Sequence, residues 1–195
     1  MAAKKSAKAE TTITLPALNI QFLRLRVVGD SALICHAWSE KAKREMLDAQ
    51  MKKARQAKEA KDPDADYRDS LYPHPAGGFG FPAVAFKNAA VDACSSIAGI
   101  TKVEARGAFH IVGDMVRIDG EPSPREDMVR VGMGTADIRY RGEFREWAAT
   151  LTLRYNANVL SAEQLANLFN VAGFAVGVGE WRPQRDGSFG MFHVE

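Results

Sequence analysis

Apolar and polar residues alternate over residues 17–28, where Leu23, Leu25 and Val27 are separated by arginines. Alternation with a period of two predicts a half-buried strand. Gly29 and Asp30 then provide a turn signal, and the apolar segment 31–38 predicts a second short strand or extended segment.

The composition changes sharply after Trp38. Ser39 can cap a helix over residues 40–61, where Ala, Lys, Glu, Gln and Met all favour helix. Residues 62–80 are rich in Pro, Gly and Asp, which predicts a loop without regular elements. We therefore expect residues 39–80 to form an inserted arm, part helix and part loop, that projects from the core.

Regular patterns return at Phe81. Pro82 suits the start of a helix, in which small and apolar residues recur on one face until Gly99 ends it. Ser161 with Gln164 three residues later forms a capping box that opens a second helix. The expected strands of this half are residues 108–118, 129–140, 146–155 and a terminal strand over 189–194.

Without the arm, the predicted order is strand, helix, two or more strands, helix, strand. This order is the α+β ferredoxin-like (RRM-like) layout, an antiparallel sheet with helices on one face. The open face of such a sheet is a common place to hold single-stranded RNA. We expect one domain over residues 15–195, carrying the arm 39–80, after a disordered basic tail at residues 1–14.

Charge and cysteine content narrow the class of protein. The 26 Lys and Arg against 24 Asp and Glu residues give a net charge of +2, which excludes a histone-like polycation. Cys35 and Cys94 cannot form a disulfide scaffold, so we expect two buried thiols in a reducing compartment. There is no membrane-length apolar run, and no apolar segment of a signal peptide follows the basic start. We therefore expect a cytoplasmic protein without a membrane partner.

The C-terminal segment combines glycines with arginines and aromatic residues. Glycines let backbone N–H groups approach phosphates, arginines supply charge, and aromatic rings offer stacking surfaces. Alternatively, the segment is a turn-rich hairpin whose glycines solve only local geometry. It matches neither a Walker loop nor a dinucleotide fingerprint. The candidate nucleic-acid contacts are Gly177, Gly179, Trp181, Arg182, Arg185, Gly187, Phe189 and Gly190.

Lys87 is the second candidate. It lies in the first turns of the helix that follows Pro82. A helix N-terminus together with a lysine can form a phosphate site. The alternative is a solvated lysine on the outer face of the helix.

Two segments together resemble a known family. FPAVAFKNAAVDA (81–93) and GVGEWRPQRDGSFGMFHV (177–194) are similar to the helix motif and the Gly-rich loop of the RAMP superfamily, RNA-binding proteins that form the backbone of CRISPR effector complexes. The arm also matches the place where these backbone subunits carry a mobile insertion. Asn88 stands where the family has a glycine, and Ala or Val replaces a following arginine, which weakens the implied grip on RNA at this helix.

The resemblance implies an RRM-like core with guide-type single-stranded RNA lying across the subunit. It further implies head-to-tail assembly with copies of itself, and contact with other effector subunits. Lys87 would be a phosphate contact, and Gly177, Gly179, Gly187 and Gly190 would be backbone contacts.

The predicted helix of the arm is basic. Residues 39–61 hold eight Lys and Arg residues against four Asp and Glu residues. A nucleic-acid-facing arm and a solvated helix with local ion pairs both fit this pattern. The candidate contacts are Lys41, Lys43, Arg44, Lys52 and Lys53.

Catalytic patterns are scarce. The four histidines are scattered, and His36 in its apolar segment is expected to be a core residue. The aspartates over residues 62–69 could hold a divalent ion or an RNase aspartate, but the pattern favours a solvated acidic loop. We predict no catalytic residue, metal or cofactor, and leave an RNase activity in this loop as an open alternative.

The leading hypothesis is a non-catalytic RNA-binding protein that assembles along a single strand. A structural or assembly protein, phage-type for example, could use the same fold for protein–protein contacts. An RNA-processing endonuclease is a third alternative. The sequence does not distinguish RNA from single-stranded DNA.

Overall fold

The computed structural model describes residues 15–53, 60–131 and 134–195. The predicted basic tail lies outside these ranges, as does part of the predicted arm helix. The elements that make up the core are β1 (Ile20–Gly29), α3 (Ala83–Ala93), β5 (Phe109–Ile111), β6 (Met115–Asp119), β9 (Ala148–Asn156), α5 (Ala162–Ala175) and β10 (Phe192–Val194).

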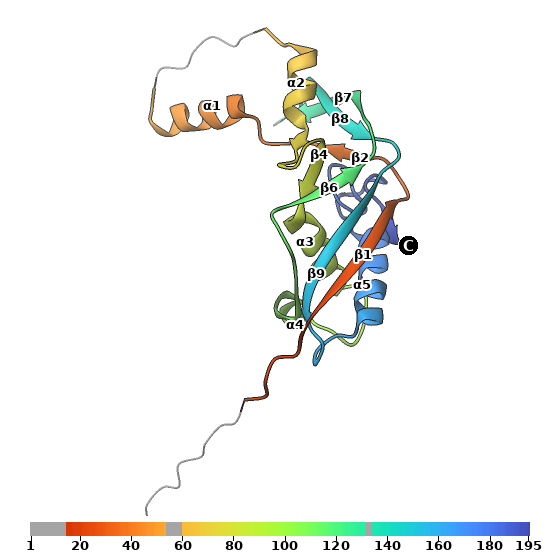
Figure 1. Ribbon diagram of the computed structural model, residues 1–195. Helices are drawn as coiled ribbons and strands as arrows, with labels where there is room; N and C mark the ends of the chain where they lie inside the picture. Colours follow the sequence, from red (N-terminus) through yellow and green to blue (C-terminus); the bar gives the residue numbers. More distant parts are fainter. Residues whose placement is uncertain (1–14, 54–59, 132–133) are drawn as a thin grey trace, which may run out of the picture.

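These elements form an antiparallel sheet in the order β10-β1-β9-β6, and β5 also pairs with β9. With β5 and β6 taken as one interrupted strand, this is the strand order of the ferredoxin-like layout. Helices α3 and α5 lie together behind β1 and β9, which leaves the other face of these strands in front (Figure 1). The predicted α+β ferredoxin-like fold class is confirmed.

Side-chain alternation along β1 separates the two faces of this sheet. Leu25 and Val27 are 6% and 0% exposed and join the core, whereas Arg24 and Arg26 are exposed on the opposite face. The predicted half-buried strand is therefore confirmed. The largest fully buried side chains of the core include Phe86, Phe109, Phe169, Phe192, Leu151, Leu153 and Leu165.

The arm differs from the prediction in its second half. Ser39 caps α1 (Glu40–Gln50) by accepting the N–H of Ala42, as expected. The expectation of a loop without regular elements over 62–80 is wrong, because that segment contains α2 (Pro63–Ser70), β3 (Tyr72–Pro73) and the start of β4 (Phe79–Pro82).

The capping of α2 explains the error. The Asp62 carboxylate accepts the N–H groups of Asp64 and Ala65, and Pro63 occupies the first turn, where its missing N–H costs nothing. Strand β4 then pairs with β6 in the main sheet, and Leu71 and Phe81 are buried. Among the described residues of the arm, α1 extends away from the core with no buried residue (Figure 1).

A second sheet is formed by β2 (Leu33–Cys35), β8 (Thr135–Phe144) and β7 (Pro122–Val131). The single strand predicted over 129–140 is wrong, because β7 and β8 pair as a long hairpin that turns within this range. Gly134, directly before β8, has a φ of 109°, a conformation that residues with a side chain rarely adopt. Helix α2 lies against this hairpin, and the Gly142 N–H donates to Ser70 Oγ at 2.7 Å.

Two further segments differ in detail from the sequence prediction. The strand expected over 108–118 divides into β5 and β6, and it is preceded by a helix that was not predicted, α4 (Lys102–Ala108). Thr101 and Glu104 form the capping box of that helix. The capping box of Ser161 and Gln164 at the start of α5 is confirmed.

Both cysteines are free and buried, as expected. Burial raises the pKa of Cys35 to about 12, so its thiol is protonated at neutral pH. In the described ranges, every helix is too short or too polar to cross a membrane.

The contact between α5 and β10 gives the first prediction. A Cβ on Gly173 would lie 1.7 Å from the carbonyl oxygen of Phe192. We expect Gly173→Ala to lower the free energy of unfolding by about 1–3 kcal/mol, since one of two packed elements must move. Gly107→Ala in α4, where no neighbouring atom lies within 4 Å, should leave it unchanged or raise it. Urea denaturation measures both, and equal stabilities would contradict this account of Gly173.

Candidate functional site

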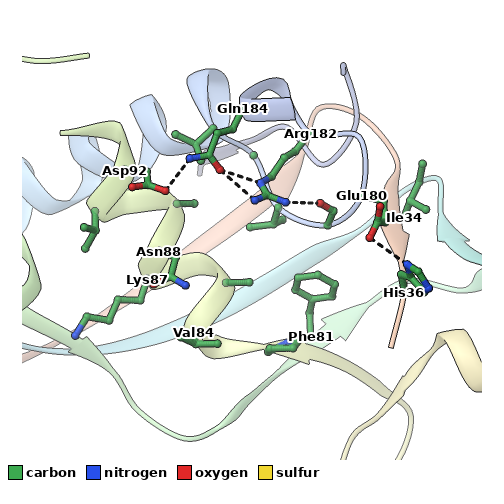
Figure 2. Close-up of a pocket in the computed structure, with 18 of the residues that line it drawn as sticks. Ile34, His36, Phe81, Val84, Lys87, Asn88, Asp92, Glu180, Arg182 and Gln184 are labelled. Carbon is green, nitrogen blue, oxygen red and sulfur yellow. Dashed lines mark hydrogen bonds and ion pairs between the residues drawn. The ribbon is translucent and has the colours of Figure 1, made fainter. Parts of the chain in front are cut away.

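A pocket of about 780 Å³ lies between α3 and the Gly-rich loop, defined here as residues 176–191 after α5 (Figure 2). Its lining includes Val84 and Lys87 from α3, and Gly177, Gly179 and Arg182 from the loop. The fold thus brings together, around one pocket, the two segments that the sequence singled out.

Glycines let the loop approach β2 closely. Gly177 and Gly179 have φ values of 69° and 81°, and a Cβ on Gly179 would lie 2.6 Å from the Ile34 carbonyl oxygen. The next residue, Glu180, donates its N–H to that same oxygen at 3.1 Å. Local geometry therefore accounts for these two glycines, as the alternative interpretation of the sequence proposed.

Backbone donors of the loop are largely engaged within the protein. The N–H groups of Gly177, Gly187 and Gly190 donate to the carbonyl oxygens of Ala172, Arg182 and Ala32, respectively. A phosphate could accept from these three glycines only if those hydrogen bonds broke. Lys87 and Arg182 also make hydrogen bonds within the protein, but an ammonium and a guanidinium each have more N–H groups than these bonds use, so they keep donors for a ligand.

Arg182 ties the loop to α3. Its guanidinium donates to the Gly179 carbonyl at 3.0 Å and to the Gln184 side-chain oxygen (Figure 2). Gln184 in turn donates its side-chain amide to Asp92 at 2.7 Å, and Lys102 pairs with the same carboxylate at 2.8 Å. Hydrogen bonds from Lys102 and Gln184 lower the pKa of Asp92.

Lys87 extends along the wall of the pocket, and its ammonium points away from the Arg182 side (Figure 2). The ammonium donates to the Arg106 carbonyl at 3.2 Å and lies 3.0 Å from His110 Nδ1. Burial lowers the pKa of Lys87, and burial together with Lys87 and Arg154 lowers the pKa of His110. With its pKa below the ordinary value, the His110 ring is neutral at pH 7, and its Nδ1 can accept the hydrogen bond from Lys87.

His36 lies on the opposite side of the pocket, where its Nδ1 is 3.2 Å from the Glu180 carboxylate. Its side chain is 43% exposed, so the expectation of a core histidine is wrong. The buried run of β2 ends at Cys35, one residue earlier. The hydrogen bond from His36 lowers the pKa of Glu180.

Trp181 and Phe189 face the β7–β8 hairpin and are not part of the pocket lining. Their rings lie 6.2 Å apart, and the Arg125 guanidinium carbon is 5.6 Å and 4.7 Å from the two ring centres. Arg125 also pairs with Asp127 and Glu143 of the hairpin. Cation–π contacts thus clamp the loop to the hairpin.

The remaining sequence candidates lie elsewhere. Lys43 pairs with Glu40 and lies over the Trp38 ring, and Lys53 pairs with Asp48 at 2.7 Å. These contacts match the local ion pairs that the sequence left as an alternative. Lys41 lines a smaller pocket of about 100 Å³ beside α2 and β8. Besides Trp181 and Phe189, the candidates that are not among the lining residues of the larger pocket are Lys41, Lys43, Arg44, Lys52, Lys53, Arg185, Gly187 and Gly190.

The acidic segment over residues 62–69 belongs mostly to α2. Within the described residues, no group of three or more His, Cys, Asp or Glu side chains is arranged to hold a metal ion. Asp62 acts there as the N-cap of the helix.

Sequence comparisons give no match, either to a family model or to a curated protein. Among solved structures, the crystal structure of Cmr6 from Pyrococcus furiosus is similar to this chain with a TM-score of 0.46 and 9% identity, over 92% of this chain and 100% of that one. A likeness of this size carries no functional argument.

The tie between Asp92 and the loop gives the second prediction. We expect Asp92→Asn to lower the free energy of unfolding at pH 7, because the amide loses the ion pair to Lys102. The folded pKa of Asp92 lies below its ordinary value, so this stabilisation is present above that value and disappears as the pH falls through the folded pKa.

Thermal or urea unfolding at pH 7 and in the acid range measures the difference between the two proteins. Asp114→Asn, at an exposed turn, provides the matched control and should have no effect at either pH. A destabilisation by Asp92→Asn that persists unchanged in acid would contradict the ion-pair account.

Proposed function

We propose that this protein binds single-stranded RNA, without catalysing a reaction on it, at the pocket between α3 and the Gly-rich loop. The observation that carries the proposal is that Lys87 and the Gly-rich loop line one open pocket. Arg106 lies at the same pocket and is exposed. Cations beside an exposed apolar wall suit a ligand that combines phosphates with flat bases.

The lining residues fit this ligand class. Val84 is 58% exposed and gives the wall its apolar surface. Lys87 and Arg106 supply positive charge at one end, and Arg182 supplies it at the other. Because three loop glycines already use their N–H groups, most of the phosphate binding falls to these side chains.

The resemblance of segments 81–93 and 177–194 to the RAMP superfamily supports the same proposal, because both segments contribute lining residues. The proposed ligand is accordingly a guide-type RNA. We extend the proposal to head-to-tail assembly of copies along the strand, together with other effector subunits.

Fluorescence polarisation with a labelled, unstructured RNA strand tests the proposal. We expect the double variant Lys87→Gln/Arg106→Gln to bind about tenfold or more weakly, since a hydrogen bond to a charged group contributes about 1.5–3 kcal/mol. The slope of log affinity against log salt concentration should fall in magnitude by about 1.4, because each neutralised phosphate of a single strand contributes about 0.7.

Arg68→Gln on α2 is the matched control, an exposed arginine outside the pocket. The proposal is wrong if the wild-type protein shows no salt-dependent binding, or if the double variant binds like the control. A parallel series with single-stranded DNA determines whether the sugar matters.

A second candidate function is assembly through protein–protein contacts, which the surface of the arm favours. Trp38, Met46, Leu47 and Met51 are each more than half exposed, and the last three lie on α1 or at its C-cap. Helix α1 buries none of its residues. Its apolar residues could pack against a second copy of the chain.

Light scattering after size exclusion tests this assembly. We expect the wild-type protein to form oligomers that dissociate on dilution, and Leu47→Glu/Met51→Glu to shift the protein to the monomer, because the new charges would be buried at the contact. Met128→Glu on β7, at a side chain 66% exposed, is the matched control and should not change the mass. A monomeric wild type at high concentration would exclude assembly through α1.

A further inference from the structure

Phe22 is a large aromatic residue on the face of the main sheet opposite α3 and α5. Its side chain is 67% exposed on β1, whereas the core side chains of that strand, Leu25 and Val27, are buried. Figure 1 views this face, with β1 and β9 in front of the helices. Burying such a ring against a partner would gain apolar contact that the described residues do not supply.

Basic side chains lie directly beside Phe22. The antiparallel register sets Phe22 opposite Arg154 on β9, and Arg154 opposite His110 on β5. In the next row, Arg24 is opposite Thr152. Directly opposite residues of neighbouring strands point to the same face, so ring and cations form one continuous surface.

The charges of this surface are free to meet an anion. Within the described ranges, no acidic side chain pairs with Arg24 or Arg154. Arg26, farther along β1, is instead occupied by Asp119 at 3.3 Å and Glu195 at 3.0 Å. The ion pairs of Arg26 therefore mark where the unpaired basic surface ends.

This surface is continuous with the pocket. His110 lies between Arg154, its register partner, and Lys87, whose ammonium is 3.0 Å from His110 Nδ1. The edge strand β5 thus connects the wall of the pocket to the open face of the sheet. A polyanionic strand that runs from the pocket past Lys87 onto the open face of the sheet would contact Arg154 first and Arg24 next.

We propose that Phe22 is a base-stacking platform for single-stranded nucleic acid, with Arg24 and Arg154 holding the phosphates on either side of the stacked base. This inference rests on the proposed function and extends the binding path from the pocket across the sheet. Charge complementarity selects the occupant, because a ring bordered by unpaired arginines matches a polyanion that carries aromatic bases. Stacking on a ring does not require the 2′-hydroxyl, so the platform accepts RNA and DNA strands alike.

Polarisation with the full-length protein and labelled single strands tests the platform. We expect Phe22→Ala to weaken binding about tenfold, because base stacking on the ring is lost. The slope of log affinity against log salt concentration should not change, because the ring neutralises no phosphate. Phe22→Trp should restore the affinity. Arg24→Gln should instead lower the magnitude of the salt slope by about 0.7. A strand that contains 2-aminopurine should show fluorescence quenching with the wild type and with Phe22→Trp, and much less with Phe22→Ala.

Phe174→Ala is the matched control, because Phe174 is 73% exposed on α5, on the other side of the sheet. Wild-type binding with equal affinities of Phe22→Ala and Phe174→Ala would overturn the platform and leave the pocket proposal standing. A wild type that binds neither RNA nor DNA strands would overturn both. If Phe22→Ala instead changes the mass in light scattering and not the affinity, the face is a protein contact and the platform is wrong.

Discussion

The antiparallel pairing of β1 with β9 is the constraint on which the other features depend. Its register runs from Ile20 opposite Asn156 to Val28 opposite Ala148. Because side chains alternate across a strand, a slip of one residue would turn Leu25 and Val27 to the open face and bury arginines in their place. The same register that builds the core under α3 and α5 therefore sets Phe22 beside Arg154, and through β5 beside the pocket.

Local patterns predicted much of this fold. The alternation around Leu25 and the capping box at Ser161 each depend on residues close in sequence, and both are confirmed. The sequence did not predict the helix at Pro63, because its Pro- and Asp-rich composition obscured the cap at Asp62. It did not predict the β7–β8 hairpin, because the alternation of apolar and polar residues over 129–140 continues through the turn at Gly134. A Pro- and Asp-rich segment can be helical where these residues occupy the first turn.

Local sequence patterns predicted less of the candidate site than of the fold. Lys87 and the Gly-rich loop could be selected from the sequence, since each carries a recognisable local pattern. Arg106 and His110 could not, because their relevance arises only from the packing of α4 and β5 beside α3. The cation–π contact between Arg125 and Trp181 could not be predicted either, because Arg125 lies on a hairpin whose register no local pattern specifies.

The contact of Arg125 with two aromatic rings of the Gly-rich loop has a consequence for the pocket. One side of the Gly-rich loop holds the hairpin through Trp181 and Phe189, while the other side forms the pocket wall at Gly177 and Gly179. Arg125 itself does not line the pocket. The segment that forms the pocket wall is therefore held in part by a residue outside the pocket, through contacts on the other side of the same loop.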